Sequence, residues 1–325
     1  MTTVQSINLP TRGITTDPAT GNVVATAGST VGPAFGNRLI VMDPGSATIV
    51  DSVFVGSEPT RVAVSADGSL AYVGLDGAGA VRIVDLPSLT PGTQFTLPER
   101  FGPTRAEDID VSPSDPTTVL VSAASSGVSP RHAGVFAYTN GVELPDNTPN
   151  HTGSNRIAFA SDGLLYGYNN ETTGFGFYKH EVDANGVRRI ESVGRLISGF
   201  GVDFTTGGTT GLSTTGIVLD LPSMTRKGTL ATSGPSAINP ANNRAFVLRN
   251  QEIHVYDLDT FIQIGTIDIP GYANGSDLIH TGGDGLAFRT GSQVVFVRDE
   301  LVPEPTSLAA LSGGMLLLGR RRRKA

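Results

Sequence analysis

The chain of 325 residues contains no cysteine and no tryptophan, and only 6% of its residues are aromatic. Without cysteine it forms neither disulfide bonds nor thiolate metal sites. Charged residues make up only 16% of the chain, and the formal net charge is -7. Five of the 23 basic residues lie in the last six positions, which leaves 18 basic residues against 30 acidic ones in the rest. A body this acidic repels phosphates and anionic membrane surfaces, so we expect no nucleic acid partner.

Glycine and proline are abundant instead, with 41 and 20 residues. They stand between short runs that are rich in β-branched side chains and that alternate apolar with polar or small residues, a pattern typical of strands. No segment before residue 300 shows a helical period. Because glycine and proline supply turn geometry cheaply, the composition predicts one all-β domain of many short strands joined by tight turns.

The clearest pattern is a unit that runs from Glu58 to Pro98. Three strand-like runs, Arg61 to Ser65, Leu70 to Gly74 and Ala80 to Asp85, precede a weaker one at Gly92 to Leu97. Asp-Gly and Pro-Ser pairs at the joints favour tight reversals. The unit is therefore predicted to be a four-stranded antiparallel meander of about forty residues, the size of one β-propeller blade.

This unit resembles a YVTN-type β-propeller repeat, whose pattern is an apolar strand, a Ser-x-Asp-Gly turn, an Ala-Tyr-Val strand and an apolar strand ending in Asp. The matching residues are Ser65, Asp67, Gly68, Ala71, Tyr72, Val73 and Asp85. Weaker copies recur along the chain at a similar period. The resemblance implies a β-propeller fold.

Counting the copies predicts seven blades in residues 1–301. Six units carry four runs each, whereas the seventh has three and ends at Asp299. The run Thr3 to Leu9 is surplus at the other end, and its sequence resembles fourth strands elsewhere. We therefore predict that it pairs with Gln293 to Arg298 and closes the ring, which leaves no unpaired seam. The alternative is a frayed N-terminal arm.

The composition changes abruptly over residues 302–325. A VPEP segment is followed by an apolar run and then by RRRRKA, an order that resembles a PEP-CTERM sorting signal recognised by exosortases. The motif residues are Pro303, Glu304, Pro305, Arg320, Arg321, Arg322 and Arg323. The resemblance implies an exported bacterial protein that is anchored transiently in the inner membrane and then reaches the cell surface or extracellular matrix.

The apolar run Thr306 to Gly319 is predicted to form a short helix. At 1.5 Å per residue it spans about 21 Å, less than the roughly 30 Å hydrocarbon core, which suits a transient anchor with its arginines in the cytoplasm. The alternative is a core helix packed on the propeller. Such a tail requires an N-terminal secretion signal, and Met1 to Pro10 has no basic start or apolar core. We expect that the start codon is misplaced or that the leader was left out of this sequence.

Catalytic and metal motifs are missing from the sequence. None of the five histidines occurs in H-x-E or HExxH spacing, and no Gly-x-Ser-x-Gly elbow precedes a helix. The Asp-Gly corners offer one carboxylate each, whereas a calcium loop needs several. We predict no catalytic residues, no metal site and no cofactor.

Arginines recur where the innermost strands of several units begin. They are Arg12, Arg61, Arg105 and Arg156, with Arg105 displaced by the Glu107-Asp108 insertion. Innermost strands line the axial channel, so these side chains, together with His280, are the candidate ligand-binding residues for a carboxylate, sulfate or acidic sugar. The alternative is that each arginine pairs with a neighbouring Asp or Glu.

These patterns favour a secreted, monomeric surface or matrix protein whose propeller is a non-enzymatic binding scaffold. An acidic glycan or small anion is the expected ligand. The alternative is a secreted propeller enzyme of the lactonase or lyase kind that uses a channel-mouth arginine with His280 or His132. A third possibility is a matrix filler without a dedicated ligand.

Overall fold

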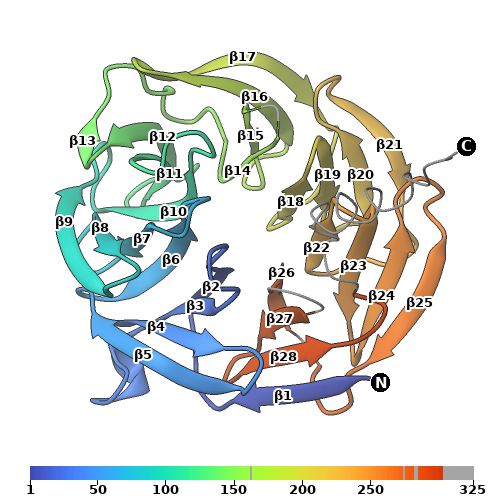
Figure 1. Ribbon diagram of the computed structural model, residues 1–325. Helices are drawn as coiled ribbons and strands as arrows, with labels where there is room; N and C mark the ends of the chain where they lie inside the picture. The colour runs from blue at the N-terminus through green and yellow to red at the C-terminus, as the bar shows by residue number, and fades with distance from the viewer. Residues whose placement is uncertain (162, 274, 282–284, 303–325) are drawn as a thin grey trace, which may run out of the picture.

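The computed structural model describes residues 1–161, 163–273, 275–281 and 285–302, and these form seven four-stranded antiparallel sheets around a central axis (Figure 1). In each sheet the strands follow one another from the axis outward. The chain is therefore a seven-bladed β-propeller, and the predicted all-β class and blade number are confirmed.

Six blades are built from consecutive strands, the first of which lies at the axis and the last at the outside. Blade 1 contains β2 (Gly13–Thr16), β3 (Val23–Ala27), β4 (Arg38–Asp43) and β5 (Thr48–Phe54). Blade 2 contains β6 (Pro59–Val64), β7 (Leu70–Leu75), β8 (Ala80–Asp85) and β9 (Thr90–Thr96). Blade 3 contains β10 (Thr104–Val111), β11 (Thr118–Ser125), β12 (His132–Thr139) and β13 (Val142–Glu143). Blade 4 contains β14 (Arg156–Phe159), β15 (Leu165–Tyr168), β16 (Gly176–Asp183) and β17 (Gly186–Gly194). Blade 5 contains β18 (Phe204–Gly207), β19 (Thr210–Ser213), β20 (Ile217–Asp220) and β21 (Thr225–Thr229). Blade 6 contains β22 (Ser236–Asn239), β23 (Arg244–Arg249), β24 (Glu252–Asp257) and β25 (Gln263–Asp268). A short 3-10 turn, η1 (Ser29–Val31), lies between β3 and β4.

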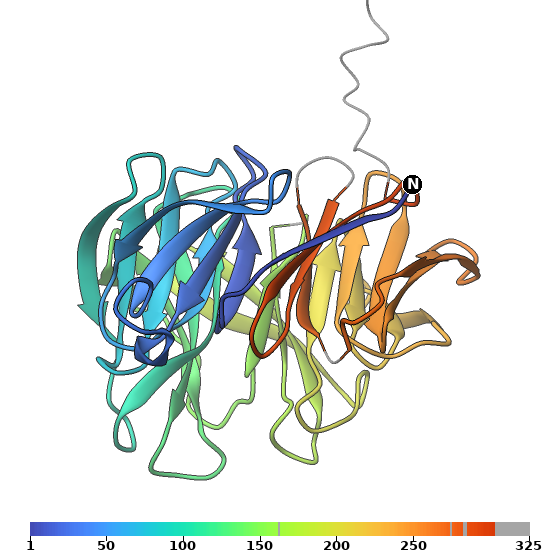
Figure 2. The same ribbon diagram turned by 90° about the horizontal axis from the view of Figure 1, so that it is seen from below.

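The seventh blade combines both ends of the described chain. It contains β26 (Ser276–His280), β27 (Gly285–Arg289) and β28 (Val294–Arg298), and its outermost strand is β1 (Thr3–Ile7). Strands β1 and β28 pair antiparallel, with Thr3 opposite Arg298 and Ile7 opposite Val294, and Figure 2 shows them side by side. The predicted closure by the N-terminal strand is confirmed.

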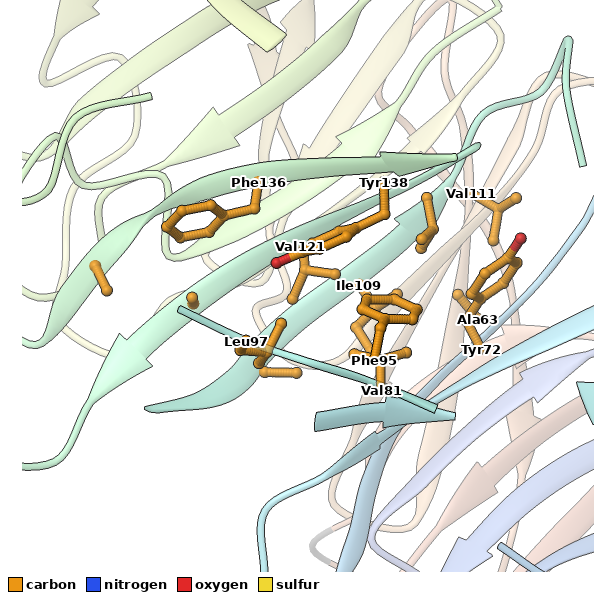
Figure 3. Close-up of a cluster of buried hydrophobic side chains, with 14 residues drawn as sticks. Ala63, Tyr72, Val81, Phe95, Leu97, Ile109, Val111, Val121, Phe136 and Tyr138 are labelled. Carbon is orange, nitrogen blue, oxygen red and sulfur yellow. The ribbon is translucent and has the colours of Figure 1, made fainter. Parts of the chain in front are cut away.

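The hydrophobic core lies between neighbouring blades. Middle strands such as β3 and β11 are buried along their whole length because each is covered on both faces by adjacent sheets, whereas outermost strands such as β5 are partly or fully exposed. Figure 3 shows the layer between blades 2 and 3, where the rings of Phe95 and Tyr138 lie 4.4 Å apart. Tyr72 is buried there, and its hydroxyl donates to the Pro116 carbonyl at 2.8 Å. Burial of side chains of this kind contributes about 1.5–3 kcal/mol each.

Blade 3 has an unusual outer edge. The sequence marks its fourth strand poorly, and β13 has only two residues. The chain then forms an isolated bridge from Asp146 to Gly186 of β17 in blade 4. Gly186 has a φ of 137°, and a Cβ there would lie 2.0 Å from the Asp146 carbonyl oxygen, so only glycine allows this close approach. The linker thus replaces the missing strand length.

The residues that follow the last strand, up to Val302, still pack against the propeller. Val302 is fully buried, and Arg244 donates to the Leu301 carbonyl at 2.8 Å. The Pro-Glu-Pro motif, the predicted apolar helix and the arginine cluster lie outside the described residues. In the part of the chain that the structure describes, no helix is long and apolar enough to cross a membrane.

Candidate ligand-binding site in the axial channel

The innermost strands surround the propeller axis (Figure 1). A cavity of about 660 Å³ lies among them. Every blade contributes to its wall, through Gly13, Arg61, Asp108, Ile157, Phe204, Ser236 and Asp277 among others. The volume lies within the range of about 300–1,000 Å³ found for small-molecule sites. Side chains that project inward from different blades therefore share one space.

Charged residues recur at one position of six innermost strands, and four of them, Arg61, Asp108, Asp203 and Asp277, line this cavity. When the innermost strands are aligned on their apolar pattern, one position holds arginine in blades 1, 2 and 4 and aspartate in blades 3, 5 and 7. These residues, the charged ring, are Arg12, Arg61, Asp108, Arg156, Asp203 and Asp277. Among the described residues, no three His, Cys, Asp or Glu side chains are grouped to hold a metal ion.

Aspartate reaches the ring in blade 3 because β10 is irregular. Its register with β11 shifts between Ala106 and Asp108, so Glu107 forms a bulge and Asp108 takes the position that arginine holds in blade 2. Arg105, which the sequence offered as the arginine of this blade, lies outside the cavity wall. The predicted displacement of Arg105 thus has a structural cause.

The carboxylates of β10 also connect blades 3 and 4. Asp108 accepts a hydrogen bond from the Ile157 amide at 2.9 Å, and Asp110 accepts one from the Phe159 amide at 2.7 Å. Burial raises the pKa of both groups, that of Asp110 to about 7, while the charge of Arg156 opposes the rise at Asp108. Two carboxyl groups with raised pKa therefore lie on the innermost strand of blade 3, and Asp108 lines the cavity.

The arginines differ in how their charge is balanced. Arg12 forms an ion pair with Glu58, and Arg156 lies 3.3 Å from Asp203 and donates to the Glu107 carbonyl at 3.0 Å. Arg61 uses its Nε to donate to the same carbonyl at 2.8 Å. Among the described residues, no carboxylate lies within ion-pairing distance of Arg61, although it lines the cavity. Ion pairs with neighbouring carboxylates therefore explain the presence of Arg12 and Arg156, whereas Arg61 forms no such ion pair among the described residues.

Arg105 lies with Arg12 and Arg61 around Asp76, in the loop after β7. Burial raises the pKa of Asp76, and its hydrogen bond from the Thr60 hydroxyl, at 2.8 Å, and the three arginines act against that rise. The structure thus brings these three arginines to one side of the channel mouth, around the half-buried Asp76 carboxyl group. Arg156, in blade 4, is not part of this group and forms its ion pair with Asp203.

His280 lies apart from the arginines. It is the last residue of β26, whereas the charged ring lies where the innermost strands begin, and the Thr16 hydroxyl at the end of β2 donates to the His280 carbonyl. Its ring packs edge-on against Phe246 at 5.4 Å. His132 is buried away from the cavity wall. The structure therefore places neither histidine beside a channel-mouth arginine.

The sequence pointed to Asp203 as a residue that could share a cavity with the arginines, but it missed Asp108 and Asp277 of the ring and one further polar group, Ser236. Aligning the later units would have revealed Asp203 and Asp277 at the arginine position. Asp277 forms an ion pair with Arg289 of β27. Ser236 also lines the cavity, is 8% exposed and has no hydrogen-bond partner for its Oγ in the described structure. No local pattern distinguishes this serine from those in turns.

Two solved structures share this architecture. The chain matches Kuenenia stuttgartiensis hydrazine synthase with 13% identity and a TM-score of 0.68, covering 91% of this chain and 98% of that one. It matches the β-propeller domain of Cps50 (Swd1) from Myceliophteria thermophila with 11% identity and a TM-score of 0.68, covering 92% of this chain and 100% of that one. The shared fold is a seven-bladed β-propeller.

At these identities the likeness shows the fold alone. No family model matches the chain, and no curated protein matches it. The resemblances to YVTN repeats and to the PEP-CTERM signal therefore stay predictions from the sequence.

Proposed function

We propose that this propeller is a non-enzymatic binding scaffold whose axial cavity takes an acidic sugar. The observation that carries the proposal is Arg61. Its guanidinium lines the cavity without a carboxylate partner among the described residues, while the neighbouring Arg12 and Arg156 are already paired. A planar guanidinium with free donors suits a carboxylate.

The rest of the cavity wall suits hydroxyl groups. Asp203 and Asp277 offer acceptor oxygens, and the buried Ser236 hydroxyl lacks a partner in the described part of the chain. A sugar acid carries one carboxylate among several hydroxyls, which matches one arginine that forms no ion pair among the described residues and lies beside acceptor groups. A second negative charge on the sugar that occupies the cavity would meet Asp203 and Asp277 and be repelled.

Substitution of Arg61 tests this site. In calorimetric titrations with galacturonate, we expect the Arg61→Gln variant to lose at least about tenfold in affinity, because a charge-assisted hydrogen bond is lost. Galactose, which lacks the carboxylate, should bind weakly to both proteins. The control is Arg82→Gln on β8, whose guanidinium contacts the Gly92 carbonyl and Gln94 outside the cavity.

Equal affinity of wild type and Arg61→Gln for galacturonate would contradict the assignment of Arg61. A lower melting temperature without a change in affinity would show that Arg61 is structural.

We further propose that the protein is exported and sorted through its C-terminal tail by an exosortase-type enzyme, with a transient inner-membrane anchor and a final place at the cell surface or in the matrix. The support is the order and spacing of the Pro-Glu-Pro motif, the apolar run and the arginine cluster. Glu304→Ala, or deletion of residues 320–324, should leave the protein in the inner membrane with its tail uncleaved. Membrane fractionation and the mass of the mature protein measure this, and normal processing of both variants would refute the proposal.

A secreted lyase-like or hydrolase-like enzyme is the second candidate, and Asp108 favours it. This carboxyl group lines the cavity, and burial raises its pKa, as general acid–base catalysts require. Its hydrogen bond from the Ile157 amide accounts for it equally as a structural link. Release of shorter products from trigalacturonate by wild type, but not by Asp108→Asn, would establish the enzyme.

A further inference from the structure

An exposed aromatic side chain lies at the rim of the axial cavity. Phe200 belongs to the linker between β17 and β18 and is 63% exposed. The next residue, Gly201, and Asp203 of the charged ring both line the cavity. A large apolar side chain is thus presented to solvent one residue away from Gly201 of the cavity wall.

The position of Phe200 is held from several sides. Its ring packs edge-on against Phe175 of the β15–β16 loop, with centroids 5.1 Å apart and planes at 70°. The Gly201 amide donates to the Asn170 carbonyl at 3.0 Å, and the buried Asn170 side chain donates to the Val202 carbonyl at 3.1 Å. Because the Phe200 ring is already ordered, its side chain loses little conformational entropy when a ligand covers it.

The two surfaces together indicate the kind of ligand. A pyranose ring has hydroxyls at its edge and an apolar face of C–H groups, which pack on an aromatic ring. The cavity provides the polar partners, among them Arg61, Asp203 and Asp277, and Phe200 provides the apolar one.

We propose that the site binds a chain of acidic sugars, with one terminal residue in the cavity and the next stacked on Phe200. This inference rests on the proposed function and extends it from a single sugar to an oligosaccharide. Phe200 sets the preference for chain length, and Arg61 anchors the terminal carboxylate.

Titrations with galacturonate and trigalacturonate separate the two roles. Wild type should bind the trimer about five- to tenfold more tightly than the monomer, as expected for one aromatic contact. Phe200→Ala should reduce trimer affinity to that of the monomer and leave monomer binding unchanged. Phe200→Trp should keep the preference for the trimer. The control is Phe54→Ala on the outer strand β5, since Phe54 is 58% exposed and lies away from the cavity.

The outcomes distinguish the inference from the function beneath it. If wild type binds the monomer and binds the trimer no more tightly, or if Phe200→Ala matches wild type, the stacking role is wrong and the acidic-sugar site stands. If wild type binds neither sugar, both proposals are refuted.

Discussion

Deletion of residues 1–9 is expected to unfold the propeller at moderate temperature and to cause association of the truncated chain. The deletion removes β1 and the buried Leu9, and it exposes the hydrogen-bonding edge of β28. It also removes the hydrogen bonds from Tyr272 to Ser6 and from Gln293 to Asn8. The loss is on the order of 5 kcal/mol, comparable to the whole stability of many domains, and a free strand edge promotes pairing between chains.

Thermal unfolding and light scattering measure this effect. Deletion of Met1 and Thr2 alone is the control, because it leaves β1 intact. A synthetic peptide of residues 1–10, added to the truncated chain, should restore the monomer by supplying the missing strand. A truncated chain that stays monomeric with an unchanged melting temperature would show that β1 is not needed for closure.

Two buried histidines are expected to lower the free energy of unfolding on acidification, and His132→Leu should remove part of this contribution. Burial lowers the pKa of His132 to about 4 and that of His180 to about 3, from 6.5 in the unfolded chain. The charge of Glu171 opposes the shift at His132, whereas Arg189 adds to that at His180. Below pH 6.5 the unfolded chain therefore binds protons that the native protein excludes, and stability falls.

The channel carboxyl groups act in the opposite direction. The pKa of Asp110 rises from 3.8 to about 7, so between pH 7 and pH 4 the native protein binds a proton that the unfolded chain does not, and stability increases on acidification. Asp108 follows the same trend. Between pH 7 and pH 4 the changes in unfolding free energy from the two histidines and from the two aspartates therefore largely cancel in the wild type. A variant that lacks one of these groups should reveal how that group changes the free energy of unfolding with pH.

Urea unfolding at pH 7 and pH 5 measures the two trends. His132→Leu should be no less stable than wild type at pH 7, because neither imidazole nitrogen has a hydrogen-bond partner among the described residues. At pH 5 it should be more stable than wild type by about 2 kcal/mol. Asp110→Asn should instead lose stability relative to wild type on acidification. The control is His151→Asn at an exposed site, and parallel pH dependences for all four proteins would contradict the account.

The fold was largely predictable from the sequence because its determinants are local. Each blade repeats the same alternation and the same turn residues, so counting runs revealed both the surplus strand at Thr3 and the missing strand after Asp299. The weak outer edge of blade 3 was also visible. Its replacement by a linker that bridges to Gly186 was not, because that contact joins two blades.

The candidate site was only half predictable. Arginines at strand starts stood out, but the aspartates at the same position depend on the bulge at Glu107 and on weaker copies of the repeat. Whether an arginine is paired is a property of three-dimensional contacts, as the difference between Arg61 and Arg156 shows. The exposure of Phe200 beside the cavity likewise depends on how two loops pack.

A crystal structure of the protein with trigalacturonate tests the central claim most directly. The account predicts a terminal sugar in the axial cavity with its carboxylate at about 2.7–2.9 Å from the Arg61 guanidinium, and the next sugar packed on the ring of Phe200. A sugar bound elsewhere on the propeller, with Arg61 facing solvent alone, would contradict it.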